Sequence, residues 1–445
     1  MRFILPLALL ISLSFADGGE AVRLSRDEFV ETALKNEPRF KEKRMEILIK
    51  EEKIEQIKAG AVLPKFEFSM LMGVVPGLRK DINDNREVES WDFTKMGPFS
   101  GVNVQAAQPL NLGQLQMGLK AARADLLQKK IDIEGKENSL KTEILSYYYG
   151  YLLAMEMNKL AQDGQKQMRK AADKLEEALD DEEEGVSQMD LLELKAGFFE
   201  IDKAVLDAQT GFKKVQLIAK FILGLPDSAS FEPLDSALAA ISDFIPDLDS
   251  LKNWAYTHHP DIRRLAAGLE ATSMQMELAS AKLAPEFFIL GEFEYAKSWA
   301  GDRTSISKDA FAQDPVNRLS GLLGIGIRYK LNFWSQWENY KIARIEHRIL
   351  RQTENYASRG IELQIEEKYE DFLVAKGKLE SARNALRATE GMLKGAALQY
   401  DINPGKTSGL LASAYKKNLL MKKDYYFAVY EYNMAVAKLF AQAGY

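Results

Sequence analysis

The stretch GLKAARADLLQKKIDIEGKENSLKTEILSYYYG, residues 118–150, lies inside a run of 116 residues, 110–225, that contains no proline. Good helix formers dominate this run as far as residue 179, and its apolar residues recur at spacings of three and four. Proline inside a helix costs about 3 kcal/mol, so its absence permits a very long helix. A helix over residues 111–179 would be about 100 Å long, which predicts coiled-coil packing against neighbouring helices.

A break and a second helix follow this long helix. Residues 180–184 are all acidic, Gly185 comes next, and Ser187 can cap a helix that runs from Met189 to Leu223. Residues 111–223 therefore predict a helical hairpin. The acidic run fits a solvated helix end as well as a functional tip, and the sequence favours neither interpretation.

The chain is predicted to contain two homologous halves. A shift of 221 residues aligns Pro64 with Pro285 and Tyr148 with Tyr369, and further landmarks follow in the same order. The first half opens with a capping box at residues 25–28. The predicted organisation is a first repeat over residues 17–226 (helix 25–59, strands about 65–74 and 100–110, hairpin 111–223), a linker over 227–248, and a second repeat over 249–445 (helix 250–283, strands about 286–296 and 321–333, hairpin 335–443).

The N-terminus has the three parts of an export signal. Arg2 supplies a positive charge, residues 3–13 are mostly apolar, and Ser14 and Ala16 are the small residues of a cleavage site. The apolar run is too short to span a bilayer. Residues 1–16 are therefore predicted to be a signal peptide of an exported protein.

The four predicted strands each have one apolar and one polar face, and each is about as long as a tilted transmembrane strand. A half-buried sheet in a soluble protein gives the same alternation. The export signal and the aromatic residues near the strand ends, where an interfacial girdle belongs, favour a membrane instead. The side chains expected to face lipid are Phe66, Phe68, Val102, Val104, Phe287, Ile289, Phe293, Ile325 and Ile327.

Four strands cannot close a barrel, and an open sheet edge is not tolerated in lipid. The chain is therefore expected to oligomerise, so that two copies give eight strands and three give twelve. An eight-stranded barrel is filled by side chains, whereas the glycines and charges on the polar faces suit a wet lumen. The predicted fold class is mainly α with a small β part, in which long coiled-coil hairpins and four transmembrane strands per chain form a trimeric α/β barrel.

The composition excludes several kinds of chemistry. There are no cysteines and three histidines, and the formal charge of −6 gives no basic excess for nucleic acid. His258 and His259 precede Pro260, a pattern typical of a helix start, and no further metal ligands accompany them. No phosphate-binding glycine loop, nucleophile elbow or zinc-protease motif is present. We expect no enzyme activity, no catalytic residues, no metal and no cofactor.

The export signal, the two repeats, the strand pairs and the long hairpins together resemble the TolC family of outer-membrane efflux and secretion channels, over essentially the whole mature chain. Residues 24–38, 59–64 and 223–226 carry the resemblance through their order and repetition. The resemblance implies a homotrimer whose twelve-stranded barrel in outer-membrane lipid continues into a periplasmic tunnel of twelve helices. It also implies a passive exit duct of a tripartite efflux pump or type I secretion system, whose tips meet an adaptor protein and an inner-membrane transporter.

The family's hairpin tip resembles an aromatic residue, two residues, glycine, five residues and then Asp-Val/Leu-Leu. In the first half, residues 190–192 fit, but an acidic residue holds the glycine place; in the second half Gly409-Leu410-Leu411 replaces the acidic triplet. The two breaks, over residues 182–190 and 403–411, are expected to lie together at the periplasmic end and to line the narrowest part of the channel. The candidates for tip, gate or adaptor contact are Glu182, Glu183, Glu184, Gly185, Asp190, Tyr400, Asn403, Gly405 and Lys406.

Two alternatives stay open. Asp190 also fits a plain helix N-terminal acid that interacts with the helix dipole. The whole chain also fits a soluble periplasmic coiled-coil scaffold in which the strands form a small sheet.

Overall fold

A computed structural model describes residues 21–83, 86–110, 112–180, 187–242, 244–300, 317–329, 331, 333–402 and 404–444. The chain divides into a helical unit (Met1–Met45, Ile131–Arg263 and Tyr356–Tyr445) and a sheet unit (Glu46–Lys130 and Arg264–Asn355). The predicted signal peptide, residues 1–16, lies outside the described residues. Helices dominate the described chain and two small sheets accompany them, which confirms the expected mainly α class with a small β part.

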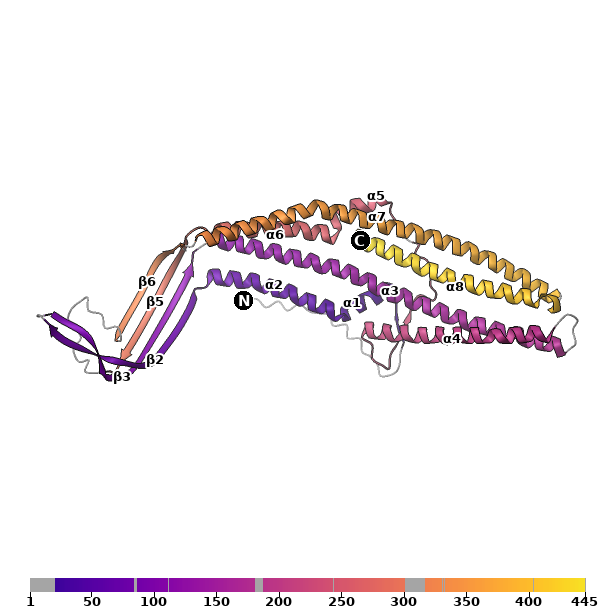
Figure 1. Cartoon of the computed structure of the whole chain (residues 1–445), viewed down its shortest axis with the longest axis horizontal. Helices are drawn as coiled ribbons and strands as arrows, with labels where there is room; N and C mark the ends of the chain where they lie inside the picture. The colour runs from indigo at the N-terminus through magenta and orange to yellow at the C-terminus, as the bar shows by residue number, and fades with distance from the viewer. Residues whose placement is uncertain are drawn as a thin grey trace. The chain divides into compact units, whose positions relative to one another are not determined.

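The sheet unit is built on four antiparallel strands in the order β2-β3-β5-β6 (Figure 1). The order makes β2 and β6 the two open edges of the sheet. Helices α2 and α6 lead into β2 and β5, whereas α3 and α7 follow β3 and β6. The bounds are α2 (Pro38–Val62), β2 (Lys65–Asn83), β3 (Arg86–Pro109), α3 (Leu112–Asp180), α6 (Pro260–Ala281), β5 (Glu286–Ser298), β6 (Arg318–Arg328) and α7 (Phe333–Ile402).

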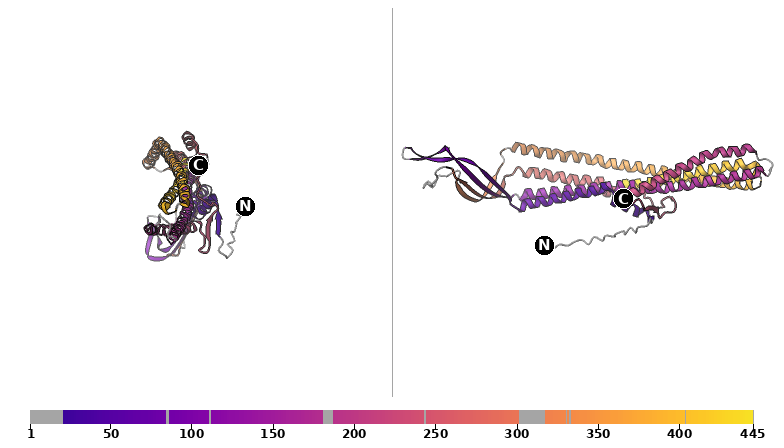
Figure 2. Two further views of the ribbon diagram at one scale, coloured as in Figure 1. Left: turned by 90° about the vertical axis from the view of Figure 1, so that its right-hand side faces the viewer. Right: turned by 90° about the horizontal axis from the view of Figure 1, so that it is seen from below.

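The β2–β3 pair is longer than the sequence predicted. Pairing continues to Asn83 and Arg86, past a register shift between Pro76 and Gly77, and Figure 2 shows this pair extending beyond β5 and β6. The predicted strand ended at about Val74, just before Pro76 and Gly77, a pair that is typical of turns. Proline is tolerated here because β2 is an edge strand and is irregular at this point.

The last strand is shorter than predicted. It was expected over residues 321–333, but β6 ends at Arg328, whose partner Glu286 is the first residue of β5. Among the described residues the pairing of β5 with β6 does not continue beyond Arg328, and Phe333 is the first residue of α7. The apolar alternation in the sequence continues to Phe333 and therefore predicted a later end for this strand than the structure has.

Two helices that were expected to be continuous are each divided by a proline. The predicted helix 25–59 is α1 (Arg26–Asn36) followed by α2, and the predicted helix 250–283 is α5 (Leu248–His258) followed by α6. Glu37 and His259 precede the prolines and have extended backbone, with ψ of 115° and 125°. The residue before a proline is disfavoured in the α region, which explains both breaks.

The second helix of each hairpin ends on a left-handed glycine. The helix α4 (Gln188–Leu223) is followed by Gly224 with φ of 65°, and α8 (Pro404–Ala443) is followed by Gly444 with φ of 82°. A Cβ on Gly224 would lie 3.2 Å from the Asn36 side chain, and one on Gly444 would lie 3.0 Å from the backbone of His259. Both glycines therefore pack against a break between the first two helices of a half.

The order of elements repeats along the chain. The elements α1, α2, β2 and α3 begin at residues 26, 38, 65 and 112, and α5, α6, β5 and α7 begin at residues 248, 260, 286 and 333. The offset is 222 residues for the first two pairs and 221 for the others. This spacing agrees with the shift found in the sequence.

Aromatic rings fill the core of the helical unit. Phe29 on α1 is fully buried, and its ring centroid lies 5.4 Å from that of Tyr148 on α3 and 5.1 Å from that of Phe231. The hydroxyl of Tyr148 donates to Asp235 (2.7 Å), and that of Tyr151 donates to the carbonyl of Phe231 (2.9 Å). Each buried phenol thus keeps a hydrogen-bond partner.

The predicted linker, residues 227–248, is part of that core. It contains β4 (Ser230–Pro233), which pairs in parallel with β1 (Ala21–Leu24), and it supplies Phe231 to the aromatic cluster. Asn433 on α8 is fully buried, donates to the Ala239 carbonyl (2.8 Å) and accepts from the Ile241 N–H (2.9 Å). The segment is therefore held by specific contacts at residues 230–233 and at Ala239 and Ile241.

Candidate membrane face and hairpin turns

The strand register brings all nine predicted lipid-facing side chains to one face of the sheet. Directly opposed residues of paired strands share a face. One row across all four strands is Phe68, Val104, Phe293 and Gly321. Neighbouring rows of this face, which we call the apolar face, contain Phe66, Val102, Phe287, Ile289, Ile325 and Ile327.

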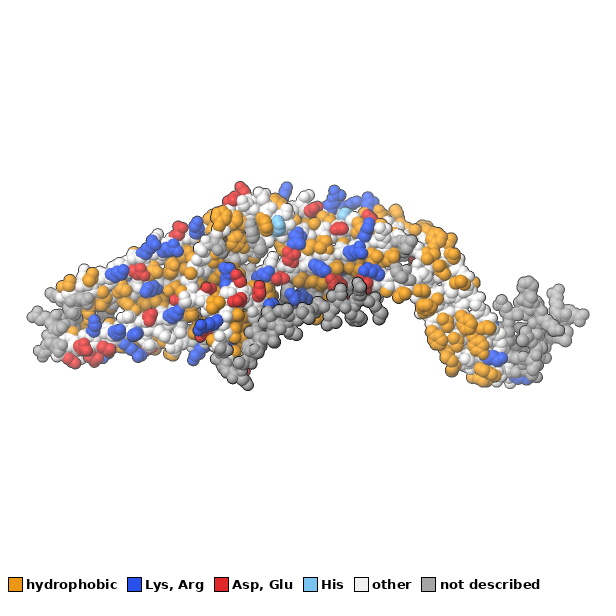
Figure 3. Space-filling model, turned by 180° about the vertical axis from the view of Figure 1, so that it is seen from behind, with side chains coloured by type: hydrophobic (Ala, Val, Ile, Leu, Met, Phe, Trp, Pro, Cys, Tyr) orange, Lys and Arg blue, Asp and Glu red, His pale blue; other side chains and the backbone are white. Residues whose placement is uncertain are grey.

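The apolar face is exposed within the chain. Phe68 is 67% exposed and Ile325 is 78% exposed. Figure 3 shows hydrophobic side chains gathered over the strands. Across residues 65–74, 98–109, 286–298 and 318–328, Lys297 is the one charged residue on this face. Such a continuous exposed apolar surface marks contact with a membrane or with another protein.

The opposite face, which we call the polar face, carries an ordered side-chain network. The amide nitrogens of Asn103 and Gln105 both donate to Oε1 of Glu292, at 2.9 and 3.0 Å, and Arg318 forms an ion pair with Glu294. The alternation in the sequence gives each strand a polar face, with Asn103 and Gln105 on one strand and Glu292 on another. It could not show that they converge, because the two hydrogen bonds join residues that are 189 and 187 positions apart.

One glycine on the polar face is packed closely. A Cβ on Gly326 would lie 2.5 Å from the ring of Phe288, whereas a Cβ on Gly324 would meet nothing within 4 Å. The Arg328 guanidinium lies over the same Phe288 ring, 4.8 Å from its centroid. Of these two glycines of β6, Gly324 is therefore the one that accepts a larger side chain.

The aromatic residues at the strand ends are not all equivalent. Phe66 and Tyr295 lie on the apolar face, but Phe99 pairs with Gly73 and lies on the polar face. Phe333 and Trp334, 56% and 63% exposed, belong to the first turn of α7 instead of a strand. Part of the expected girdle thus sits on a helix end.

The first hairpin turn is described on both sides of its acidic run. Met189 N–H donates to the Ser187 hydroxyl (3.1 Å), which confirms the cap predicted for α4. Ala172 and Leu175 of α3 pack against Leu191 of α4 and hold the hairpin together. The acidic candidates of this turn and its glycine, Glu182, Glu183, Glu184 and Gly185, lie outside the described residues, and Asp190 is described only as a backbone position in α4.

The second hairpin turn is tighter than predicted. The break was expected over residues 403–411, but α8 already begins at Pro404, a residue favoured at the first helical position. Leu410 and Leu411 are therefore helical. Of the candidates in this turn, Asn403 lies outside the described residues, and Gly405 and Lys406 are described as backbone of α8.

Tyr400 connects the two hairpins. It is 9% exposed, and the ammonium of Lys174 on α3 lies 5.9 Å from the centroid of its ring. Tyr400 is in the last turn of α7 and Lys174 is six residues before the end of α3. The contact brings the ends of these two helices close to one level.

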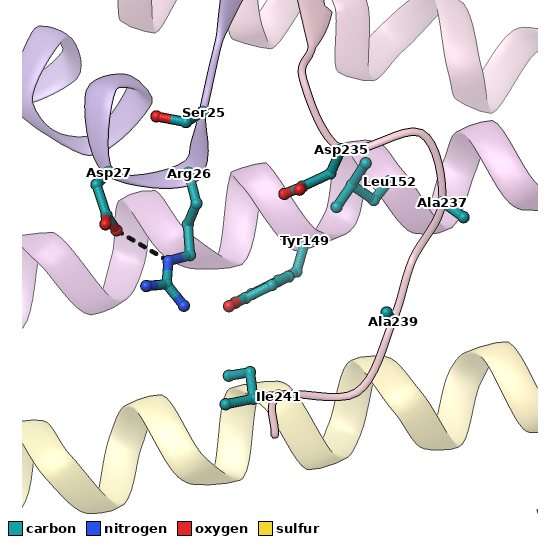
Figure 4. A pocket seen from close by; sticks show the side chains of 9 residues that line it. All are labelled: Ser25, Arg26, Asp27, Tyr149, Leu152, Asp235, Ala237, Ala239 and Ile241. Atoms are coloured by element: carbon teal, nitrogen blue, oxygen red, sulfur yellow. Dashed lines mark hydrogen bonds and ion pairs between the residues drawn. The ribbon is translucent and has the colours of Figure 1, made fainter. Parts of the chain in front are cut away.

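A hollow of about 300 Å³ lies beside the aromatic core (Figure 4). Nε of Arg26 donates to Asp27 (2.9 Å), which holds the pKa of Arg26 above its ordinary value. Burial, and then the hydrogen bond to Asp235, raise the pKa of Tyr148 beneath it. The polar groups here are paired within the chain, which indicates a structural role. The lining residues are Ser25, Arg26, Asp27, Tyr149, Leu152, Asp235, Ala237, Ala239 and Ile241.

The two adjacent histidines shape a helix junction. His258 stacks on Trp254 with centroids 3.7 Å apart, and Nδ1 of His259 accepts from the Asp261 N–H (3.1 Å) at the start of α6. Across the described residues, no group of three or more His, Cys, Asp or Glu side chains is arranged to hold a metal ion.

None of the helices in the described ranges combines the length and the apolar character needed to cross a membrane.

Known proteins share the combination of a four-stranded sheet and long helical hairpins seen in this chain. No family model and no curated protein sequence matches the chain. Solved structures match almost its whole length. The outer-membrane channel OprN is 16% identical with a TM-score of 0.69, and 94% of this chain and 89% of that chain are covered.

Two further structures agree. CusC, studied for transmembrane channel formation, is 13% identical with a TM-score of 0.69, covering 97% of this chain and 95% of that chain. The CmeC outer-membrane channel of Campylobacter jejuni is 14% identical with a TM-score of 0.68, covering 94% and 85%. The chain therefore has the fold of the TolC-type outer-membrane channels, as the resemblance predicted.

Proposed function

We propose that the chain is a subunit of a passive exit channel in the outer membrane, with its helices in the periplasm. The observation that carries the proposal is the exposed apolar face of a four-stranded sheet with two open edges, in a chain that has the fold of outer-membrane channels. An open sheet edge is not tolerated in lipid, so the edges must pair with other copies. Three copies give twelve strands, with the apolar faces against lipid and the polar faces around a lumen.

Contacts within the sheet unit support closure from chain to chain. Lys50 on α2 pairs with Asp125 on α3 (2.5 Å). Gln114 on α3 donates to the Ala281 carbonyl of α6 (3.0 Å). On α6, Thr272 lies within hydrogen-bond distance of a histidine on α7 (3.0 Å). The helices are therefore in the order α2-α3-α6-α7, which leaves α2 and α7 at the edges, as β2 and β6 are in the sheet.

The two edge helices both carry exposed apolar side chains. Leu48 and Ile49 on α2 are 52% and 56% exposed, and Ile345 and Ile349 on α7 are 54% and 58% exposed. Exposed charges of both signs flank each pair, including Glu52 and Lys53 on α2 and Arg344 and Glu346 on α7. Apolar contact between unlike edges would bury both surfaces.

The proposed trimer also implies where partner proteins would bind. The trimer would place three copies of each hairpin turn at one end of the tunnel, where an adaptor protein and an inner-membrane transporter would dock. Tyr400 and the residues on either side of the acidic run, including Asp190, are the proposed contacts. The soluble scaffold is disfavoured, because it leaves the apolar face in water.

Cysteine crosslinking tests the closure. The chain has no cysteine, so an Ile49→Cys and Ile345→Cys variant introduces the only two thiols. Ile49 lies thirteen residues before the end of α2 and Ile345 twelve residues after the start of α7, so the two should meet at one level. Oxidation in detergent should give covalent dimers and trimers on a non-reducing gel.

A matched control replaces Ile49→Cys by Leu127→Cys, because Leu127 is exposed but lies on the inner helix α3. This control should stay monomeric on the gel. A stable monomer or dimer by mass measurement in detergent would overturn the trimer. A trimer without the α2–α7 crosslink would overturn only the proposed closure.

A further inference from the structure

The charges on the polar face cancel with one exception. Over residues 65–74, 98–109, 286–298 and 318–328 this face carries three basic and four acidic side chains. Arg318 is paired with Glu294. Glu286 and Arg328 are directly opposed in the register, and Lys65 and Glu67 are neighbours on one face of β2. The remaining charge is Glu292.

Glu292 is fixed in place by neutral donors. Among the described residues its hydrogen-bond donors are two neutral amides, those of Asn103 and Gln105, both on Oε1. An amide donor orients a carboxylate but adds no positive charge. Arg318, on the adjacent strand β6, forms its ion pair with Glu294 and has only a weaker electrostatic interaction with Glu292. The side chain is therefore an ordered negative charge at the middle of β5.

We propose that Glu292 sets the ion selectivity of the channel, so that small inorganic cations are favoured over anions. The inference rests on the proposed duct, in which three copies of Glu292 form a ring in the barrel lumen. A unit charge about 10 Å away in water changes the local concentration of a monovalent ion about twofold. Three fixed charges at one level should thus give a several-fold preference that salt screens.

The proposal differs from a general effect of acidic composition. Glu294 is on the same strand and face, two residues away, but its charge is compensated by Arg318. Removing Glu292 should therefore weaken the cation preference, whereas removing Arg318 should uncover Glu294 and strengthen it. The two substitutions should therefore change the cation preference in opposite directions.

Reversal potentials in planar bilayers under a KCl gradient test this inference. Wild-type channels should prefer K⁺ over Cl⁻, more strongly at about 0.01 M than at about 1 M salt. Glu292→Gln should lower the permeability ratio several-fold, and Arg318→Gln should raise it. Lys297→Gln, on the apolar face, should leave the ratio unchanged. A change of the ratio with Lys297→Gln as large as that with Glu292→Gln would overturn the proposal.

A positional variant completes the test. Asn103→Leu combined with Gln105→Leu keeps the charge but removes the two donors, so cation preference should fall by less than in Glu292→Gln. Each variant is first shown to be a trimer by mass. If the channels conduct but neither Glu292→Gln nor Arg318→Gln changes their selectivity, this inference alone is overturned. If the trimers do not conduct at all, the proposed duct is overturned.

Discussion

The aromatic core of the helical unit and the apolar face of the sheet unit use the same kinds of side chain in opposite ways. Phe29 is fully buried between Tyr148 and Phe231, whereas Phe68 on the sheet is 67% exposed within its own chain. In the core, the apolar side chains are buried within a single chain. The sheet face leaves its apolar groups to be covered from outside the chain, which in the proposed channel a lipid bilayer would do.

The largest expected effect breaks the core. Phe29→Ala should lower the free energy of unfolding by about 3–5 kcal/mol, because it leaves a cavity in a packed cluster. Phe68→Ala in detergent should change it by less than about 0.5 kcal/mol, because its side chain is exposed. Urea unfolding followed by circular dichroism measures both. Equal losses would show that the sheet face is packed against protein.

The second prediction concerns the apolar face. Ile325→Arg places a charge against lipid, at a cost of about 2–4 kcal/mol near the bilayer centre, and should reduce the yield of assembled channel in the outer membrane. Gly324→Arg is the matched control, since that position is on the polar face and has space around it. Gly326 is unsuitable, because Phe288 lies against it. Equal tolerance of both arginines would contradict the assignment of faces.

The third prediction compares buried and open amides. Asn433→Ala should cost about 1–3 kcal/mol, because the Ala239 carbonyl and the Ile241 N–H lose their buried partner. Asn103→Ala should change stability by less than about 0.5 kcal/mol, because water in an open lumen can replace the amide. Unfolding midpoints of the two variants give the comparison. A larger loss for Asn103→Ala would place the polar face inside a dry interface.

The smallest expected change in stability concerns α1, the helix on which the buried Phe29 lies. Ser25→Ala should cost about 1 kcal/mol, because the α1 capping box is lost. Hydrogen bonds from the Ser25 N–H and hydroxyl lower the pKa of Glu28. A lowered carboxyl pKa stabilises the fold above the ordinary pKa, and this contribution disappears as the pH falls through the lowered value.

The stability difference between wild type and Glu28→Gln should accordingly be present at neutral pH and vanish in acid. Unfolding measured over a pH series checks the sign. A difference that grows in acid would mean that the carboxyl is bound in its protonated form.

Much of the fold follows from local features of the sequence. The proline-free runs predicted α3, observed at residues 112–180 where 111–179 was expected, because helix formation depends on neighbours a few residues apart. Period-two alternation likewise assigned nine side chains to apolar faces, and the register places all nine on one face. Hydrophobic periodicity requires no knowledge of the partner strand.

Features that depend on distant partners could not be derived in this way. The end of β6 at Arg328 is set by where β5 begins, and the extra length of β2 and β3 is set by their pairing with each other. The predicted linker contains β4 because it meets β1, about two hundred residues earlier in the chain. The sequence by itself determined the helices, the repeats and the apolar alternation, since these are set by residues close along the chain. Only the tertiary structure decided that Asn103 and Gln105 hold Glu292, because strand register joins segments that no local pattern connects.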